Sequence, residues 1–161
     1  MLVDTLARKT WLDRQRYRPQ QWATQQYWRA HDAARERWHG FDCLQPIAGL
    51  DLALVSLIGQ TLGHAGVAVR TDRTWLLDAG DAYFDDREMD VERPRCTPGL
   101  RFNQWLIKKD SRTRLANHQR LRELVRTVGA QVEIFCSRDL TEFERLAGVS
   151  ADLPAGFVPA G

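Results

Sequence analysis

Apolar and polar positions in the middle of the chain follow the pattern of short strands. Residues 52–58 are apolar except for Ser56, and such a nearly continuous run predicts a buried strand. Two more apolar runs, residues 65–70 and 74–78, are separated by the turn-like sequence Thr71-Asp72-Arg73 and predict a β-hairpin. The centre of the chain is therefore predicted to be rich in β-structure.

The pattern changes to a helical period in the carboxy-terminal part. An amphipathic helix of about 12 residues is predicted to end at Gly129, because apolar residues recur at positions i, i+3, i+4 and i+7: Leu121, Leu124, Val125 and Val128. Residues 131–136 predict a short strand. Thr141 and Glu144 have the spacing of a capping box, which predicts a final short helix. The order helix, strand, helix indicates an α/β layer.

The first 38 residues are rich in Arg, Gln and Trp and contain no Gly. Pro19 divides them into two predicted helices, near residues 4–16 and 20–37. A cationic aromatic surface could bind single-stranded nucleic acid, but we favour packing of these rings against a sheet, because large aromatic side chains on helices usually bury there. The aromatic residues concerned are Trp11, Trp22, Tyr27, Trp28 and Trp38.

One domain is predicted over residues 1–148, with residues 1–38 as a helical connecting segment and residues 40–148 as the β-rich core and carboxy-terminal helices. The polar, proline-containing stretch 85–99 is predicted to be an irregular surface loop. Residues 149–161 have the Pro- and Gly-rich composition of a flexible tail.

Composition and charge narrow the classes of function. Lys and Arg together number 23 against 21 Asp and Glu, and the charges are interspersed, so we expect neither nucleic acid nor a membrane as a partner. No apolar run approaches the roughly 20 residues needed to cross a bilayer, and the cytoplasm is the expected location. Cys43, Cys96 and Cys136 form no Cys-x-x-Cys pair and are expected to be reduced thiols.

Candidate chemistry begins in the loop after the first predicted strand. The sequence Gly59-Gln60-Thr61-Leu62-Gly63-His64 resembles the Gly-His-Thr-Pro-Gly-His loop of metallo-β-lactamase-fold metallo-hydrolases. The resemblance covers about residues 40–148 and the carboxy-terminal part of that family. It implies an α/β fold, a partial αββα sandwich preceded by amino-terminal helices. The first His of the family loop is a zinc ligand, so the resemblance places Gln60 at a ligand position.

Two further motifs carry the resemblance. Residues 76–83, Leu-Leu-Asp-Ala-Gly-Asp-Ala-Tyr, are similar to the family's strand-ending Gly-Asp element, whose carboxylate bridges two metals, and this implies that Asp81 is a remnant ligand. The alternative is an Asp that caps a turn. Residues 132–143 are similar to a segment that carries a His-Asp pair, and Arg138 occupies the position of the ligand His.

The family's upstream signature, His-x-His-x-Asp-His, has no match in residues 1–58, where His31 and His39 stand alone. A hydrolytic zinc site needs about three protein ligands, and this chain retains one. Arg138 is a permanent cation without a lone pair, and it could instead form an ion pair with Asp81. We therefore expect no cofactor in this chain, although intact relatives hold zinc, often as a binuclear centre.

The remaining candidates are His64 and Tyr83, which could line a pocket. The alternatives are a loop histidine bonded to the backbone and ordinary aromatic packing. The resemblance implies a truncated or degenerate hydrolase, a pseudoenzyme that is inactive as this chain. Two alternatives are a non-catalytic binding or assembly protein and an active zinc-dependent ester or lactone hydrolase whose missing ligands come from another chain. Half a sandwich would leave one sheet face open, which predicts a homodimer or a partner protein over that face.

Overall fold

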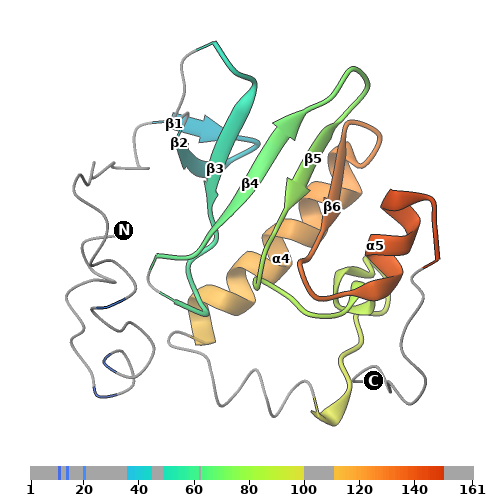
Figure 1. The fold of residues 1–161 in the computed structure, drawn as a ribbon. Helices are drawn as coiled ribbons and strands as arrows, with labels where there is room; N and C mark the ends of the chain where they lie inside the picture. Colours follow the sequence, from blue (N-terminus) through green and yellow to red (C-terminus); the bar gives the residue numbers. More distant parts are fainter. Residues whose placement is uncertain are drawn as a thin grey trace.

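A mixed sheet forms the centre of the protein (Figure 1). The computed structural model describes residues 36–44, 49–61, 63–99 and 111–150, together with Trp11, Arg14 and Gln20. Six strands lie in sequence order: β1 (Glu36–Trp38), β2 (Phe41–Leu44), β3 (Leu52–Ser56), β4 (Ala65–Arg70), β5 (Trp75–Asp78) and β6 (Val132–Phe135). The first five are successively antiparallel, and β6 is parallel to β5. The predicted α/β class is confirmed.

The predicted central hairpin is confirmed. β4 pairs with β5 from Val67 opposite Asp78 to Arg70 opposite Trp75. In the turn, the Thr71 hydroxyl donates a hydrogen bond of 2.7 Å to the carbonyl oxygen of Thr74. The predicted strand over residues 52–58 is also present, and its ladder ends at Ser56 because the chain then turns into the loop that carries Gln60.

A hairpin at the amino-terminal edge of the sheet was missed. The helix predicted to extend to residue 37 is wrong at residues 36 and 37, where β1 pairs with β2 instead. His39 (φ 45°) and Gly40 (φ 85°) form the connecting turn, in which positive φ angles match the twist of the strands. Apart from Gln20, the remainder of that predicted helix lies outside the described residues, as does the helix predicted near residues 4–16 except for Trp11 and Arg14.

The aromatic side chains of this part of the chain differ in burial. Trp38 is 7% exposed and contacts Trp75 edge to face with 5.8 Å between ring centroids, as expected for an aromatic residue packed on a sheet. Trp11 is 72% exposed, so the prediction that these rings are buried is wrong for Trp11.

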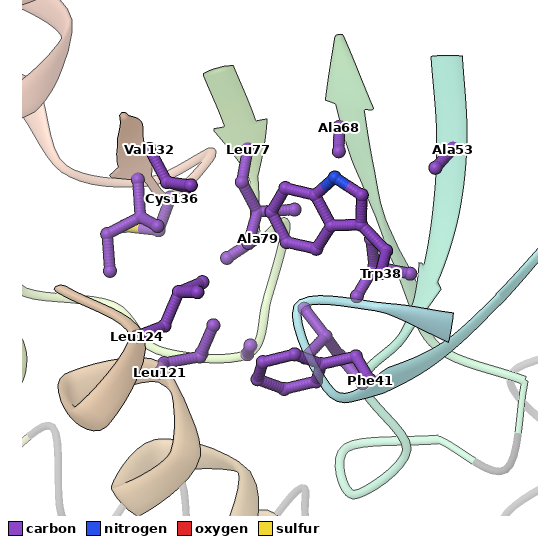
Figure 2. Packing of buried hydrophobic residues seen from close by; sticks show 14 of the residues in the cluster. Trp38, Phe41, Ala53, Ala68, Leu77, Ala79, Leu121, Leu124, Val132 and Cys136 are labelled. Carbon is purple, nitrogen blue, oxygen red and sulfur yellow. The ribbon is translucent and has the colours of Figure 1, made fainter. Parts of the chain in front are cut away.

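One long helix, α4 (Ser111–Val128), lies across one face of the sheet (Figure 1). It has 18 residues and is longer than predicted. The apolar pattern did not indicate its first half, because polar residues face inward there. Asn117, for example, is buried and donates a 2.7 Å hydrogen bond to the carbonyl oxygen of Ile58. Figure 2 shows the core between helix and sheet, which includes Trp38, Phe41, Ala53, Ala68, Leu77, Leu121, Leu124 and Val132.

The final helix, α5 (Leu140–Ala147), begins differently from the prediction. The predicted capping box at Thr141 and Glu144 is wrong. The N-cap is Asp139, whose carboxylate accepts hydrogen bonds from the backbone N–H groups of Thr141 and Glu142. With Asp139 as the N-cap, the helix begins two residues earlier than a helix capped by Thr141 would begin. Asp139 satisfies the free amides of the first turn.

Side chains of α5 protect the outer edge of β6. Glu142 accepts a 2.7 Å hydrogen bond from the backbone N–H of Cys136, and Arg145 donates a 3.5 Å bond to the carbonyl oxygen of Ile134. These bonds occupy backbone groups that would otherwise be open to pairing with another strand.

The prediction of an irregular surface loop over residues 85–99 is partly wrong. Residues 86–89 form a short 3₁₀ helix, η3 (Asp86–Met89), in which Glu88 and Met89 are buried. Glu88 is held because its carboxylate accepts a hydrogen bond from the backbone N–H of Phe84. Residues 90–95 are exposed, as predicted.

Two other expectations concern the thiols and the membrane. Cys43, Cys96 and Cys136 are all free, and Cys43 and Cys136 are buried. Neither α4 nor α5, nor any other helix in the part of the chain that the structure describes, combines the length and apolar character needed to cross a bilayer.

Candidate functional site

Three loops that carry predicted ligand positions meet at one end of the sheet. β3 and β5 are both antiparallel to β4, and β6 is parallel to β5, so these three strands end at the same edge. Gln60 follows β3, Asp81 follows β5 and Arg138 follows β6. The topology therefore brings together three residues that are far apart in the sequence.

Asp81 is the centre of this cluster. Arg138 Nε donates a 2.6 Å hydrogen bond to Asp81 Oδ1, and Arg138 Nη2 lies 3.3 Å from Oδ2. Gln60 Nε2 donates a 2.8 Å bond to the same Oδ2. The Arg138 guanidinium also lies 5.4 Å from the centroid of the Phe84 ring. The hypothesised ion pair between Arg138 and Asp81 is thus present.

Backbone hydrogen bonds hold the loops after β5 and β6 in register. The N–H of Ala79 donates to the carbonyl oxygen of Phe135 (2.8 Å), and the N–H of Ser137 donates to that of Gly80 (3.2 Å), so the β5–β6 pairing continues into the site. Gly80 has a φ of 57°, and a Cβ there would lie 2.9 Å from His64 Nε2. Glycine at this position therefore allows Asp81 to approach both the histidine and Arg138.

His64 is bound to the backbone through both ring nitrogens. Its Nδ1 lies 2.8 Å from the carbonyl oxygen of Leu57, and its Nε2 lies 3.1 Å from the backbone N of Asp81. Because a carbonyl only accepts and an N–H only donates, these contacts fit the neutral ring with its proton on Nδ1. The interpretation of His64 as a loop histidine bonded to the backbone agrees with this geometry.

Tyr83 does not join the Asp81 cluster. It is fully buried, and its hydroxyl donates a 2.8 Å hydrogen bond to Glu142 Oε1. The second carboxylate oxygen of Glu142 accepts the bond from Cys136 N–H. Glu142 was not identified from the sequence. Its position three residues after Asp139, at the start of a helix, was the one available signal.

The surroundings of Asp81 and Glu142 shift the pKa values of these two carboxylates in opposite directions. Burial alone would raise the pKa of Asp81, but hydrogen bonds from Arg138 and Gln60 and the charge of Arg138 lower it below its usual value. The hydrogen bond to Asp81 and the charge of that carboxylate raise the pKa of Arg138. For Glu142, burial dominates and raises the pKa, although the bonds from Cys136 and Tyr83 oppose this effect. Burial also raises the pKa of the Cys136 thiol to about 12.

The donor set does not fit a zinc ion. Both oxygens of Asp81 already accept hydrogen bonds from Arg138 or Gln60, and both nitrogens of His64 bind the backbone. Arg138 offers no lone pair, and its charge repels a cation. Gln60 directs its amide nitrogen toward Asp81 and retains only a neutral oxygen donor.

A second group of carboxylates lies nearby and was not expected from the sequence. Single oxygens of Asp85, Asp86 and Asp139 lie within 4.8 Å of one another. Two of these carboxylates bind donors of the chain itself: Asp85 accepts two hydrogen bonds from the Arg87 side chain, and Asp139 caps α5 and accepts from the backbone N–H of Asp86. The group therefore ties η3 to α5.

Comparison with known proteins identifies curated relatives over most of the chain. Probable metallo-hydrolases of Mycobacterium bovis and Mycobacterium tuberculosis are each 33% identical over 129 residues, 79% of this chain. Those residues are 41% of each relative, so the chain spans about two fifths of the length of the relatives that it matches. No protein-family model matches the sequence.

Similar solved structures include an N-acyl homoserine lactone hydrolase with N-hexanoyl-L-homoserine bound at its catalytic metal centre. It has a TM-score of 0.46 and 18% identity, over 64% of this chain and 36% of that chain. A B. thuringiensis protein with N-decanoyl-L-homoserine at its active site gives the same TM-score, identity and coverage.

Proposed function

The chain is similar to probable metallo-hydrolases, and from this premise we propose that it is a degenerate member of the metallo-β-lactamase-fold metallo-hydrolase family, without hydrolytic activity as this chain. The single observation that carries the proposal is the ion pair between Arg138 and Asp81. It puts a fixed positive charge on the one carboxylate that the resemblance assigns to metal binding.

Metal binding would have to displace contacts that are already made. Asp81 would give up hydrogen bonds to Arg138 and Gln60, and the Arg138 guanidinium would have to leave the site before a dication could approach. The carboxylate with lowered pKa is already stabilised in its charged form by Arg138, so the metal is not needed to compensate that charge.

The competing proposal is an active zinc-dependent ester or lactone hydrolase whose other ligands come from another chain. Additional ligands would not remove Arg138 from the Asp81 carboxylate. We therefore favour the non-catalytic proposal, in which the Gln60, Asp81 and Arg138 side chains hold three loops together without a metal.

Metal analysis of the purified chain tests this proposal. The protein is exposed to zinc or manganese, desalted and measured by inductively coupled plasma mass spectrometry, with Asp81→Ala as the matched variant. We expect near-zero metal in both proteins. A stoichiometric ion in the natural chain that is lost in Asp81→Ala would contradict the proposal and would call for a search for hydrolase activity.

A gain-of-function variant sharpens the test. Gln60→His combined with Arg138→His removes the repelling charge and places three potential ligands at the ends of β3, β5 and β6, so we expect it to bind zinc. The control makes the same chemical changes on the exposed face of α4, as Gln119→His with Arg126→His. Equal zinc binding by both double variants would show that added histidines alone, not this site, account for the gain.

A further inference from the structure

We propose that two neighbouring residues of α4, Asn117 and His118, are positioning residues for the candidate site. Each of them holds one of the two loops that bring Gln60 and Asp81 together. Both side chains are buried, and neither contacts the Asp81 carboxylate itself. The inference rests on the part of the proposed function in which these side chains join the loops without a metal, and it does not depend on the absence of activity.

Asn117 holds the loop after β3. Its Nδ2 donates a 2.7 Å hydrogen bond to the carbonyl oxygen of Ile58, two residues before Gln60. Its Oδ1 accepts a 3.2 Å bond from Arg120 Nη1, and because a guanidinium only donates, this contact fixes the amide with its nitrogen toward the loop. Arg120 is held in turn, since its Nη2 donates a 2.8 Å bond to the carbonyl oxygen of Gly40.

The same loop lies directly against the backbone of α4. A Cβ at Gly59 would lie 2.8 Å from both Cα and Cβ of Arg114. Because these atoms belong to the helix itself, a larger residue at position 59 would push the loop away. The position of Gln60, the next residue, therefore follows the position of α4.

His118 holds the loop after β5. Its Nε2 lies 2.6 Å from the carbonyl oxygen of Ala82, the residue that follows Asp81. Because a carbonyl only accepts, the ring carries a proton on Nε2 and donates this bond. The loop that carries Asp81 is thus bonded to the helix from the side opposite to His64.

The two hydrogen bonds start from adjacent residues of one helix. α4 therefore fixes the distance between the carbonyl oxygens of Ile58 and Ala82. A functional side chain keeps a precise position when the segment behind it is bonded to a rigid element. His64 bonds both loops as well, but it belongs to the loop after β3 and moves with it. The helix thus sets the separation at which Gln60 meets Asp81.

The two positioning residues should have different effects when they are removed. Loss of Asn117 should release Gln60 alone, because the β5–β6 pairing still holds Asp81 beside Arg138. Loss of His118 should loosen the Asp81 loop and so weaken the contacts of Asp81 with both Gln60 and Arg138.

Proton–nitrogen NMR correlation spectra of the metal-free chain test the proposal through two N–H groups that donate to Asp81. These reporters are Gln60 Nε2 and Arg138 Nε. Gln60→Leu and Arg138→Ala assign their signals, and Asp81→Ala gives their chemical shifts without the carboxylate. A charge-assisted hydrogen bond to a carboxylate is short and strong, so each reporter should lie downfield of its position in Asp81→Ala.

Asn117→Ala should move the Gln60 signal most of the way to its position in Asp81→Ala and leave the Arg138 signal in place. His118→Phe should move both signals. The matched control is Val125→Ala, which truncates an apolar side chain of the same helix that packs against the core. It should move neither signal, even where it lowers the free energy of unfolding as much as Asn117→Ala does.

An unmoved Gln60 signal in Asn117→Ala would overturn the proposal, as would an equal displacement of that signal by Val125→Ala. Asn117→Leu keeps about the size of the side chain and removes only its hydrogen bonds, and it should displace the Gln60 signal as Asn117→Ala does. Circular dichroism establishes that each variant is folded. Failure here is distinct from failure of the proposed function: zinc binding by the natural chain would overturn the latter, whereas an unmoved Gln60 signal overturns only the positioning role.

Discussion

Two carboxylates at the same edge of the sheet receive hydrogen bonds in a similar way but lie in different surroundings. Asp81 accepts bonds from Arg138 and Gln60, and its side chain is 25% exposed beside an Arg138 side chain that is 60% exposed. Glu142 accepts bonds from Tyr83 and from Cys136 N–H and is 5% exposed. The comparison shows that the number of hydrogen bonds that a carboxylate accepts does not by itself determine its contribution to the free energy of unfolding. Water can replace the lost hydrogen-bond partners around Asp81, but it cannot replace them around Glu142.

The largest difference between the two clusters should appear on truncation. Glu142→Ala leaves the Tyr83 hydroxyl and the Cys136 N–H buried without an acceptor, and we expect it to lower the free energy of unfolding by about 2–4 kcal/mol. Asp81→Ala leaves Arg138 and Gln60 able to bind water, and we expect a loss of less than about 1 kcal/mol. Urea unfolding followed by circular dichroism measures both.

Glu142→Gln is the conservative control for this comparison. It preserves the shape of the side chain and one acceptor oxygen. Its free energy of unfolding should therefore lie between that of the natural chain and that of Glu142→Ala. If Asp81→Ala were as destabilising as Glu142→Ala, exposure would not determine the difference between the clusters.

The pH dependence of stability should have opposite signs at the two carboxylates. Glu142 has a raised pKa in the folded protein, so the folded state retains a proton that the unfolded state loses. Its contribution therefore falls as pH rises from the ordinary Glu pKa to the raised value. Asp81 has a lowered pKa, so its contribution is present above the ordinary Asp pKa and is lost as pH falls through the lowered value.

Difference curves isolate these contributions from the other titrating groups. Urea unfolding is repeated from acid to neutral pH for the natural chain, Glu142→Gln and Asp81→Asn. We expect Glu142→Gln to remove part of the loss of stability above the ordinary Glu pKa, and Asp81→Asn to remove part of the loss in acid. The same sign of change in both difference curves would contradict the assigned pKa directions.

The exposed cluster was much more accessible to sequence reasoning than the buried one. Gln60, Asp81 and Arg138 match family motifs in order, so the resemblance implied that they share one site. Glu142 looks like an ordinary charged residue on a short helix, and only the fold turns it toward Tyr83.

The errors in the predicted elements have related causes. The β1–β2 hairpin was missed because Glu36 and Arg37 look helical when read with the Arg-rich sequence before them, whereas pairing with β2 decides their structure. The first half of α4 was missed because its inward positions are Asn117 and His118, which are satisfied by backbone carbonyl oxygens of distant loops. Apolar periodicity detects neither tertiary pairing nor buried polar contacts.

The smallest expected effect concerns the ion pair itself and can be separated from packing by a double-mutant cycle. Arg138→Ala, Asp81→Asn and the double variant are compared by urea unfolding with the natural chain. Because the Arg138 side chain is largely exposed, we expect a coupling free energy of about 0.5 kcal/mol, which should decrease as salt is added. If the losses of the two single variants simply add in the double variant, the two charges do not stabilise each other. In that case the proximity of Arg138 to Asp81 would result only from the β5–β6 pairing that carries both loops.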